Sequence, residues 1–191
     1  PYTTLFRSST PAPEGWLGST KSVAGWVAPG GTPTRLRFAT ATGGAVVPLD
    51  KLQSLGRMAR AHGLRVHLDG ARLWNAHVAT GVSIADYAAC ADTVMMCFSK
   101  GLGAPVGSIL VGSAEHVRAA RRVRKRLGGG MRQVGVLAAA GLVALDSMVD
   151  RLAEDHVNCR RLAEGVSRLP RVRLDLATVQ TNIVIFRVER D

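Results

Sequence analysis

The chain has 191 residues, of which 47% are hydrophobic, and a formal net charge of +11. This length suffices for one domain core and part of a second, and the composition is typical of a globular protein. No run of 18 or more apolar residues occurs, and residues 1–20 lack a basic start followed by an apolar core. The sequence therefore predicts neither a membrane span nor a secretory signal, and we expect a cytoplasmic protein.

The positive charge does not by itself indicate a nucleic-acid-binding protein. Only four of the 25 basic residues are lysine, and the arginine-rich cluster at residues 118–126 has no interleaved aromatic side chains for stacking on bases. The three cysteines lack C-x-x-C spacing, and we interpret them as packing residues: Cys90, Cys97 and Cys159. We expect no nucleic acid, membrane or metal ion as a partner.

The N-terminal part predicts little structure. Residues 1–8 (P-Y-T-T-L-F-R-S) resemble the translation of a sequencing-adapter tail, which we interpret as an assembly scar. Residues 9–42 are rich in Pro, Gly, Thr and Ala, and they predict irregular or mistranslated sequence, with a flexible linker as the alternative. We expect ordered structure to begin at Gly43.

The pattern over residues 43–147 is that of an α/β fold. Apolar residues at three-residue spacing after Pro48 predict a helix over residues 49–62. Residues 64–68 and 92–98 predict parallel strands, the second buried on both faces, joined through a helical turn at 84–89. A further strand is predicted at 106–111, followed by a helix over residues 113–126 that Ser113 caps.

The remaining sequence predicts a second, smaller unit. Three glycines at 128–130 break the preceding helix, and residues 133–145 and 148–169 predict two more helices. Short strands are predicted at 172–176 and 183–188, and the pattern then stops incomplete. We therefore divide the chain into a large-domain part, residues 43–147, and the start of a small α+β domain, residues 148–191.

Two charged residues follow the predicted parallel strands, Asp69 and Lys100. Parallel strands end at one edge of a sheet, where ligands of open α/β sheets bind. A lysine among apolar residues is expected to be desolvated and to offer a free amine for a Schiff base, and Asp69 would pair with the ring nitrogen if pyridoxal phosphate were present. Arg72 is placed to hold a carboxylate. The alternative is a buried Asp69–Lys100 ion pair without a cofactor.

Four motifs in this order carry a resemblance to a known family. The sequences H-L-D-G-A-R (67–72), S-K-G-L-G-A-P-V-G-S (99–108), R-K-R-L-G-G-G-M-R-Q (124–133) and L-A-E-D-H (152–156) resemble the low-specificity L-threonine aldolases. These are fold type I pyridoxal-phosphate enzymes. The resemblance covers roughly residues 43–188 and implies part of their large domain, a mostly parallel sheet with helices on both faces, with the start of the small C-terminal domain.

The resemblance also implies roles for individual residues. Lys100 matches the Schiff-base lysine, Asp69 the partner of the pyridine nitrogen, and Ser99 a neighbouring cofactor ligand. Arg72 matches a ligand of the substrate carboxylate and contributes to the cofactor site. The implied reaction is cleavage of L-threonine or L-allo-threonine to glycine and an aldehyde.

Lys125 and Arg132 flank the glycine run. They match basic positions that in the family lie near the active site at a subunit interface, which implies a homo-oligomer, a dimer or a tetramer. A solvated helix end is the alternative interpretation.

The sequence departs from the family before Gly43. Residues 38–42 read F-A-T-A-T where the family shows a Glu-Asn-Thr-His-like stretch, and the phosphate-binding loop and the ring-stacking histidine have no counterpart. We interpret His67 as a packed strand residue rather than a substitute for that histidine. We expect an incomplete enzyme of low solubility, with an uncovered face or edge of the sheet. The alternatives are another fold type I β-eliminating lyase or a non-catalytic basic binding fragment.

Overall fold

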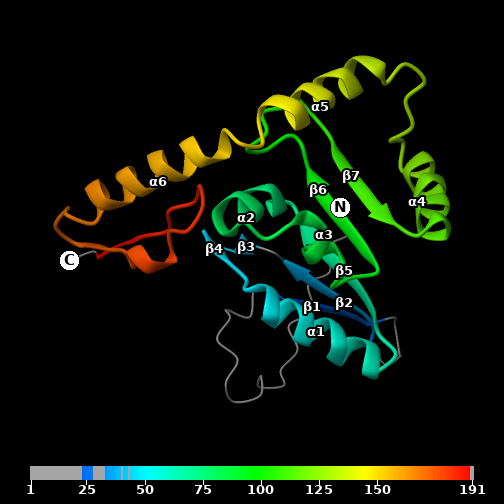
Figure 1. The fold of residues 1–191 in the computed structure, drawn as a ribbon, viewed down its shortest axis with the longest axis horizontal. Helices are drawn as coiled ribbons and strands as arrows, with labels where there is room; N and C mark the ends of the chain where they lie inside the picture. The colour runs from blue at the N-terminus through cyan, green and yellow to red at the C-terminus, as the bar shows by residue number, and fades with distance from the viewer. Residues whose placement is uncertain (1–22, 28–32, 40, 43, 190–191) are drawn as a thin grey trace.

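The computed structural model describes residues 23–27, 33–39, 41–42 and 44–189 (Figure 1). A five-stranded sheet has the strand order β1-β2-β5-β6-β7. At its centre β2 (Pro33–Ala39), β5 (Arg65–Gly70) and β6 (Thr93–Cys97) run parallel. The outer strands β1 (Val23–Val27) and β7 (Ser108–Gly112) are antiparallel to their neighbours. The predicted α/β class is confirmed.

Strands β1 and β2 correct the prediction that residues 9–42 are irregular. Phe38 is 1% exposed and pairs in register with Leu68 of β5, whereas Arg37 beside it is exposed. This alternation is that of a strand with one buried face, but it is short and stands among turn-forming residues that obscure it. The interpretation of residues 1–8 as a scar lies outside the described residues.

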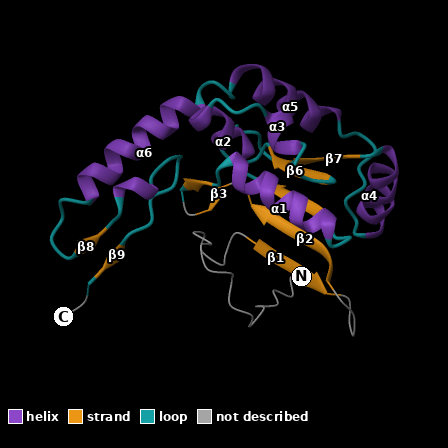
Figure 2. Ribbon diagram, turned by 60° about the horizontal axis from the view of Figure 1, so that its bottom comes forward, coloured by secondary structure: helices purple, strands orange, loops and turns teal. Residues whose placement is uncertain are grey.

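The core lies on one face of the sheet. Its strand side chains are fully buried beneath α1 (Leu49–Ala61), α2 (Leu73–Thr80) and α3 (Ile84–Ala88), which Figure 2 shows beside the strands. The helices contribute Leu52, Leu73 and Tyr87 to this core. The prediction that β6 is buried on both faces is wrong, because Thr93, Met95 and Cys97 on the other face are only half-buried. The helices α1, α2 and α3 thus cover the face of the sheet that carries this core.

Local signals set most helix boundaries correctly. Helix α1 matches the predicted 49–62, and α4 (Ala114–Arg126) begins where Ser113 Oγ accepts a hydrogen bond from the backbone N–H of His116 at 3.2 Å. The crossover between β5 and β6 contains α2 as well as the predicted turn, which is α3. Helix α2 ends at Gly81, whose φ of 73° is readily adopted by glycine.

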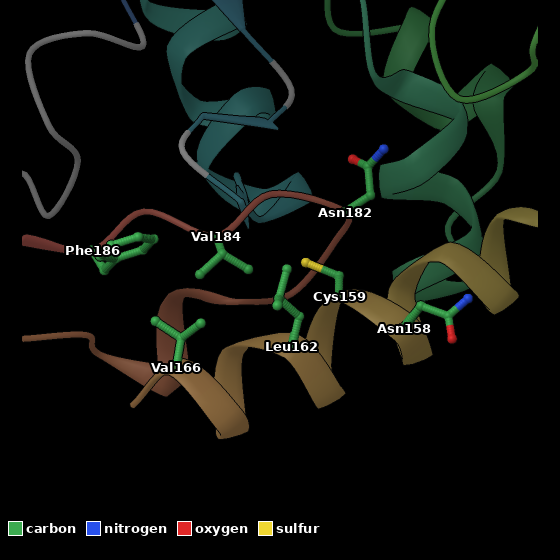
Figure 3. Close-up of a pocket in the computed structure, with 7 residues that line it drawn as sticks. All are labelled: Asn158, Cys159, Leu162, Val166, Asn182, Val184 and Phe186. Carbon is green, nitrogen blue, oxygen red and sulfur yellow. The ribbon is translucent and has the colours of Figure 1, made fainter. Parts of the chain in front are cut away.

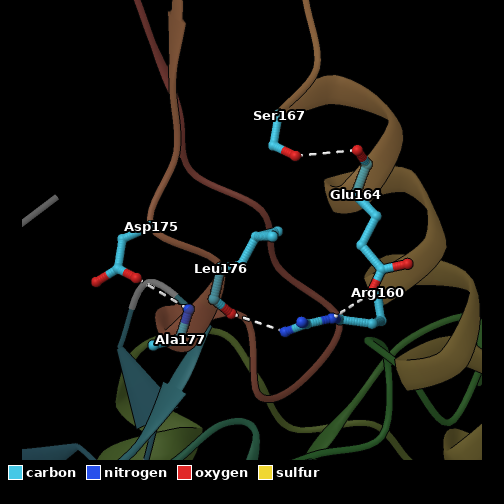
Figure 4. A network of polar contacts seen from close by, with 6 residues as sticks. All are labelled: Arg160, Glu164, Ser167, Asp175, Leu176 and Ala177. Atoms are coloured by element: carbon cyan, nitrogen blue, oxygen red, sulfur yellow. Dashed lines mark hydrogen bonds and ion pairs between the residues drawn. The ribbon is translucent and has the colours of Figure 1, made fainter.

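The C-terminal region consists of α5 (Gly135–Ser147), α6 (Leu152–Val166), a 3₁₀ turn (Leu176–Thr178) and two antiparallel strands, β8 (Val172–Arg173) and β9 (Arg187–Val188). Figure 4 shows how α6 is tied to the turn: Arg160 donates to Glu164 Oε1 at 2.7 Å and to the carbonyl of Leu176 at 2.9 Å. The short β3 (Ala41–Thr42) and β4 (Ala45–Val46) lie near this region, because Thr181 Oγ1 donates to the carbonyl of Gly44. The division at residue 148 stays a prediction.

None of the helices in the described ranges is long and apolar enough to cross a membrane.

Candidate active site

Asp69 lies at the carboxyl end of β5. The strand register pairs Asp69 with Met95 and the next residue, Gly70, with Met96 of β6. Asp69 Oδ1 accepts a hydrogen bond from the backbone N–H of Ala71 at 3.2 Å, and Oδ2 lies 3.5 Å from Nη1 of Arg37 on β2. With a quarter of its side chain exposed, the carboxylate stays accessible on the less covered face of the sheet.

Lys100 lies in a tight turn after β6. The carbonyl of Lys100 accepts a hydrogen bond from Gly103 N–H at 2.9 Å, and Gly103 has a φ of 71°. The side chains of Ser99 and Lys100 are exposed. The expectation of a lysine desolvated among apolar residues is therefore wrong within this chain, because Leu102, which is 2% exposed, fills the apolar cluster beneath the turn instead.

The two predicted residues share one sheet edge, since β5 and β6 are parallel neighbours and both residues follow the carboxyl ends. The ion pair of Asp69 is with Arg37 and not with Lys100, which removes the alternative of a buried Asp69–Lys100 pair. Arg72 is half-buried at the first turn of α2, three residues beyond Asp69. Its role as a carboxylate ligand stays a prediction.

Lys125 and Arg132 lie elsewhere. Both are exposed, Lys125 near the end of α4 and Arg132 in the loop that follows. Strand β7 separates α4 from β5 and β6, as Figure 1 shows at the right of the view. Within one chain the structure does not bring these two residues together with Asp69 and Lys100.

His67 lies on the same face of β5 as Asp69. Its Nδ1 is 2.9 Å from Oγ1 of Thr93 on the neighbouring strand. Burial lowers the pKa of His67 from its ordinary value of 6.5, the Asp69 carboxylate opposes that shift, and the Arg37 guanidinium adds to it. The residue is a half-buried, hydrogen-bonded strand residue, in agreement with its interpretation from sequence.

The residues at this edge fit pyridoxal phosphate at two points. An exposed primary amine is accessible to the cofactor aldehyde, and a partly exposed carboxylate is available to the ring nitrogen. The turn after Lys100 carries glycines at 101, 103 and 107, and Cβ atoms at 103 and 107 would have no neighbour nearer than 3.8 Å, so the backbone there is open to close approach. No group of three or more His, Cys, Asp or Glu side chains in the described part of the chain could hold a metal ion.

Sequence reasoning missed Arg37 and Asn75, and it gave no role to His156, which ends the motif L-A-E-D-H. Arg37 lay in a segment predicted to be irregular, although its alternation with Leu36 and Phe38 was a usable signal. Asn75 is 2% exposed on the mostly apolar α2 and contacts His156 of α6. A single amide among apolar helix residues is the signal that points to a buried polar contact.

A separate hollow lies along α6 (Figure 3). It has a volume of about 360 Å³ and is lined mainly by apolar side chains: Asn158, Cys159, Leu162, Val166, Asn182, Val184 and Phe186. Cys159 is the one ionisable side chain in this lining, and burial raises the pKa of its thiol. The hollow therefore has no group suited to acid–base work near neutral pH.

Known proteins resemble this chain over most of its length. Over 149 residues the chain is 49% identical to "Probable low-specificity L-threonine aldolase 2" of Arabidopsis thaliana, covering 78% of this chain and 42% of that protein. It is 43% identical over 145 residues to the low specificity L-threonine aldolase of Escherichia coli K12, covering 76% of this chain and 43% of that protein. The chain thus spans less than half the length of these relatives.

Solved structures show the same fold. A structure from Exiguobacterium sp. 255-15, assigned as an aromatic amino acid beta-eliminating lyase/threonine aldolase, superposes with a TM-score of 0.71 at 28% identity, covering 76% of this chain and 42% of that one. The threonine aldolase of Leishmania major superposes with a TM-score of 0.64 at 21% identity, covering 75% of this chain and 43% of that one.

The family model of the beta-eliminating lyases matches residues 35–189, which include β2, β5, β6 and the lysine turn. The chain therefore belongs to the beta-eliminating lyase family.

Proposed function

We propose that this chain carries the lysine and aspartate of a pyridoxal-phosphate-dependent aldolase. Its reaction is the cleavage of L-threonine or L-allo-threonine to glycine and acetaldehyde. The observation that carries the proposal is the placement of Asp69 and Lys100 after the carboxyl ends of two adjacent parallel strands. The names of the relatives support the choice of substrate.

Each residue has a distinct task in this proposal. The Lys100 amine binds the cofactor, and the Asp69 carboxylate holds a proton on the pyridine nitrogen. Ser99 lies beside the lysine, and the Arg72 guanidinium holds the substrate carboxylate. When bound, pyridoxal phosphate supplies the electron sink that makes cleavage of the Cα–Cβ bond feasible.

We further propose that the enzyme works as a homo-oligomer. The loop and helix after α4 expose large apolar side chains, with Leu127 80%, Met131 57% and Val136 75% exposed. Apolar surface of this kind is typical of subunit interfaces. Lys125 and Arg132 flank it and would reach the active site of a neighbouring copy.

We propose the cytoplasm as the compartment. All three cysteines are free thiols, two of them buried, as is usual in a reducing environment.

Two other functions remain as alternatives. Another beta-eliminating lyase would use the same lysine and aspartate, and the description of the matching family favours it. A basic binding module is favoured by α4, whose exposed surface carries a dense cluster of basic residues.

A titration with pyridoxal phosphate tests the proposal. A visible absorbance band should form in the chain and be absent in Lys100→Ala, and acetaldehyde should be released from L-allo-threonine. Release of ammonia without acetaldehyde would favour the β-eliminating alternative. Salt-dependent binding to DNA without any visible band would favour the binding module.

A further inference from the structure

The backbone next to Lys100 lies near a partly buried hydrogen bond between two helices. Asn75, on α2, is 2% exposed, and its Nδ2 lies 3.2 Å from Nε2 of His156 on α6. The two residues are separated by 81 positions in the sequence. A buried amide is costly to leave without a partner, so this bond favours one spacing of the two helices.

Gly101 brings the lysine turn close to Asn75 of this pair and to Leu152 of α6. A Cβ atom at Gly101 would lie 2.6 Å from Cδ2 of Leu152 and 3.5 Å from Oδ1 of Asn75. Leu102 packs in the same apolar cluster as Leu152. The turn therefore has no free space towards α2 and α6, and a change in their spacing moves the residue next to Lys100.

We propose that Asn75 and His156 are positioning residues for Lys100: their hydrogen bond fixes the spacing of α2 and α6, and that spacing fixes the turn that presents the amine. They act through Gly101 and touch no reacting atom. The inference rests on the proposed function, because there Lys100 is the reactive amine, and it extends the site to α6.

The hydrogen bond depends on the charge of His156. When the amide N–H donates, Nε2 accepts and the neutral ring carries its proton on Nδ1. Burial lowers the pKa of His156 from its ordinary value of 6.5, and Asp155 beside it on α6 is the charged group that opposes this shift. Asn75 of α2 and Leu152, which pack here, are uncharged. Protonation sets two N–H donors against each other and opens the contact.

Amide hydrogen exchange of the full chain without cofactor tests the proposal. His156→Leu removes the acceptor, whereas His156→Gln keeps a polar amide that does not titrate. We expect the peptide 98–107 to exchange about tenfold faster in His156→Leu and within about twofold of the unsubstituted chain in His156→Gln. The peptide of α1, residues 49–61, is the internal control and should not change.

The pH dependence separates positioning from packing. In the unsubstituted chain the exchange of peptide 98–107, corrected for the intrinsic rate at each pH, should rise as His156 protonates, which exchange of its Cε1 hydrogen reports. The rise should vanish in His156→Gln. A side chain that only fills space would show no such link, and this arm does not require His156→Leu to fold.

The link to Lys100 is measured by borohydride trapping of pyridoxal phosphate. The label on Lys100, relative to that on the exposed Lys51 of α1, should fall about threefold or more in His156→Leu, since a mobile turn presents the amine less often. The proposal is overturned if peptide 98–107 exchanges at the same rate in His156→Leu, or if the α1 peptide accelerates equally. It is also overturned if exchange of peptide 98–107 does not change as His156 protonates. If the turn responds as expected but the unsubstituted chain binds no cofactor, the proposed function fails while the positioning of the turn stands.

Discussion

At the scale of single residues, Arg37 is the charged partner of Asp69. Its Nη1 lies 3.5 Å from Asp69 Oδ2, and their side chains are 46% and 25% exposed. A guanidinium here repels a protonated ring nitrogen and competes with it for the same carboxylate oxygen. Arg37 is therefore the residue whose removal should change the cofactor site without removing one of its proposed ligands.

Arg37→Leu should raise the affinity for pyridoxal phosphate. A partly exposed ion pair contributes about 0.2–1 kcal/mol, so we expect a gain of about 1.4- to fivefold, measured by absorbance titration. Arg65→Leu is the matched control, because Arg65 pairs with Asp92 at 3.7 Å near the start of β5, away from the site. Equal or weaker binding in Arg37→Leu would show that the pair does not compete with the cofactor.

The half-buried histidines make stability depend on pH. Burial lowers the pKa of both His67 and His156 below 6.5, so between that value and the folded pKa the unfolded chain binds protons that the folded chain does not. Above pH 6.5 these two histidines therefore cost the folded chain no stability. As the pH drops through this window, the free energy of unfolding should fall. His67→Gln should flatten the pH dependence of the free energy of unfolding, measured by urea unfolding from about pH 7.5 to about pH 5.5.

At the scale of elements, glycines inside helices have opposite consequences. A Cβ at Gly56 of α1 would lie 2.6 Å from the backbone carbonyl of Cys90, so α1 approaches the end of α3 closely. A Cβ at Gly165 of α6 would meet nothing within 4 Å.

Gly56→Ala should destabilise the chain, while Gly165→Ala should stabilise it by about 0.5–1 kcal/mol through helix propensity. In Gly56→Ala the same gain is outweighed by displacement of α1, for which we expect a loss of about 1–3 kcal/mol. Chemical denaturation of both variants measures the difference. Stabilisation by both changes would mean that α1 does not pack as closely as described.

Element prediction from sequence succeeded where the signal was local. The spacing after Pro48 and the cap at Ser113 depend on residues within one or two turns, and both helices were located correctly. Strand β2 was missed because its alternation is brief among prolines and glycines. The site edge followed from strand order, but the exposure of Lys100 did not, since Leu102 two residues later takes the buried position. The Asn75–His156 contact joins positions too far apart for any local pattern to predict.

At the scale of the molecule, much apolar surface is exposed. All residues of β7 are exposed, including Ile109, Leu110 and Val111 at 39%, 37% and 42%, and this strand forms an edge of the sheet. An apolar edge strand can pair with other chains. On α5, Leu142 and Val143 are each 61% exposed. This supports the expectation of low solubility, although β1 and β2 extend the sheet beyond the strands predicted.

Charged substitutions on this surface should increase the soluble fraction. Val111→Lys with Leu142→Glu breaks both patches without removing buried side chains, so we expect about a twofold or larger gain in monodisperse protein by size-exclusion chromatography. Lys51→Glu, on exposed polar surface, is a control that should not improve it. A cooperative, monodisperse unsubstituted chain would contradict the expectation.

The most direct test of the shared Asp69–Lys100 site is to locate the lysine that captures pyridoxal phosphate. After borohydride reduction and digestion, we predict that the label lies on Lys100 among the four lysines of the chain and falls about tenfold in Asp69→Asn, because the carboxylate holds the ring in place. The account would be contradicted if Lys51, Lys100 and Lys125 were labelled to a similar extent and if Asp69→Asn did not change the label on Lys100.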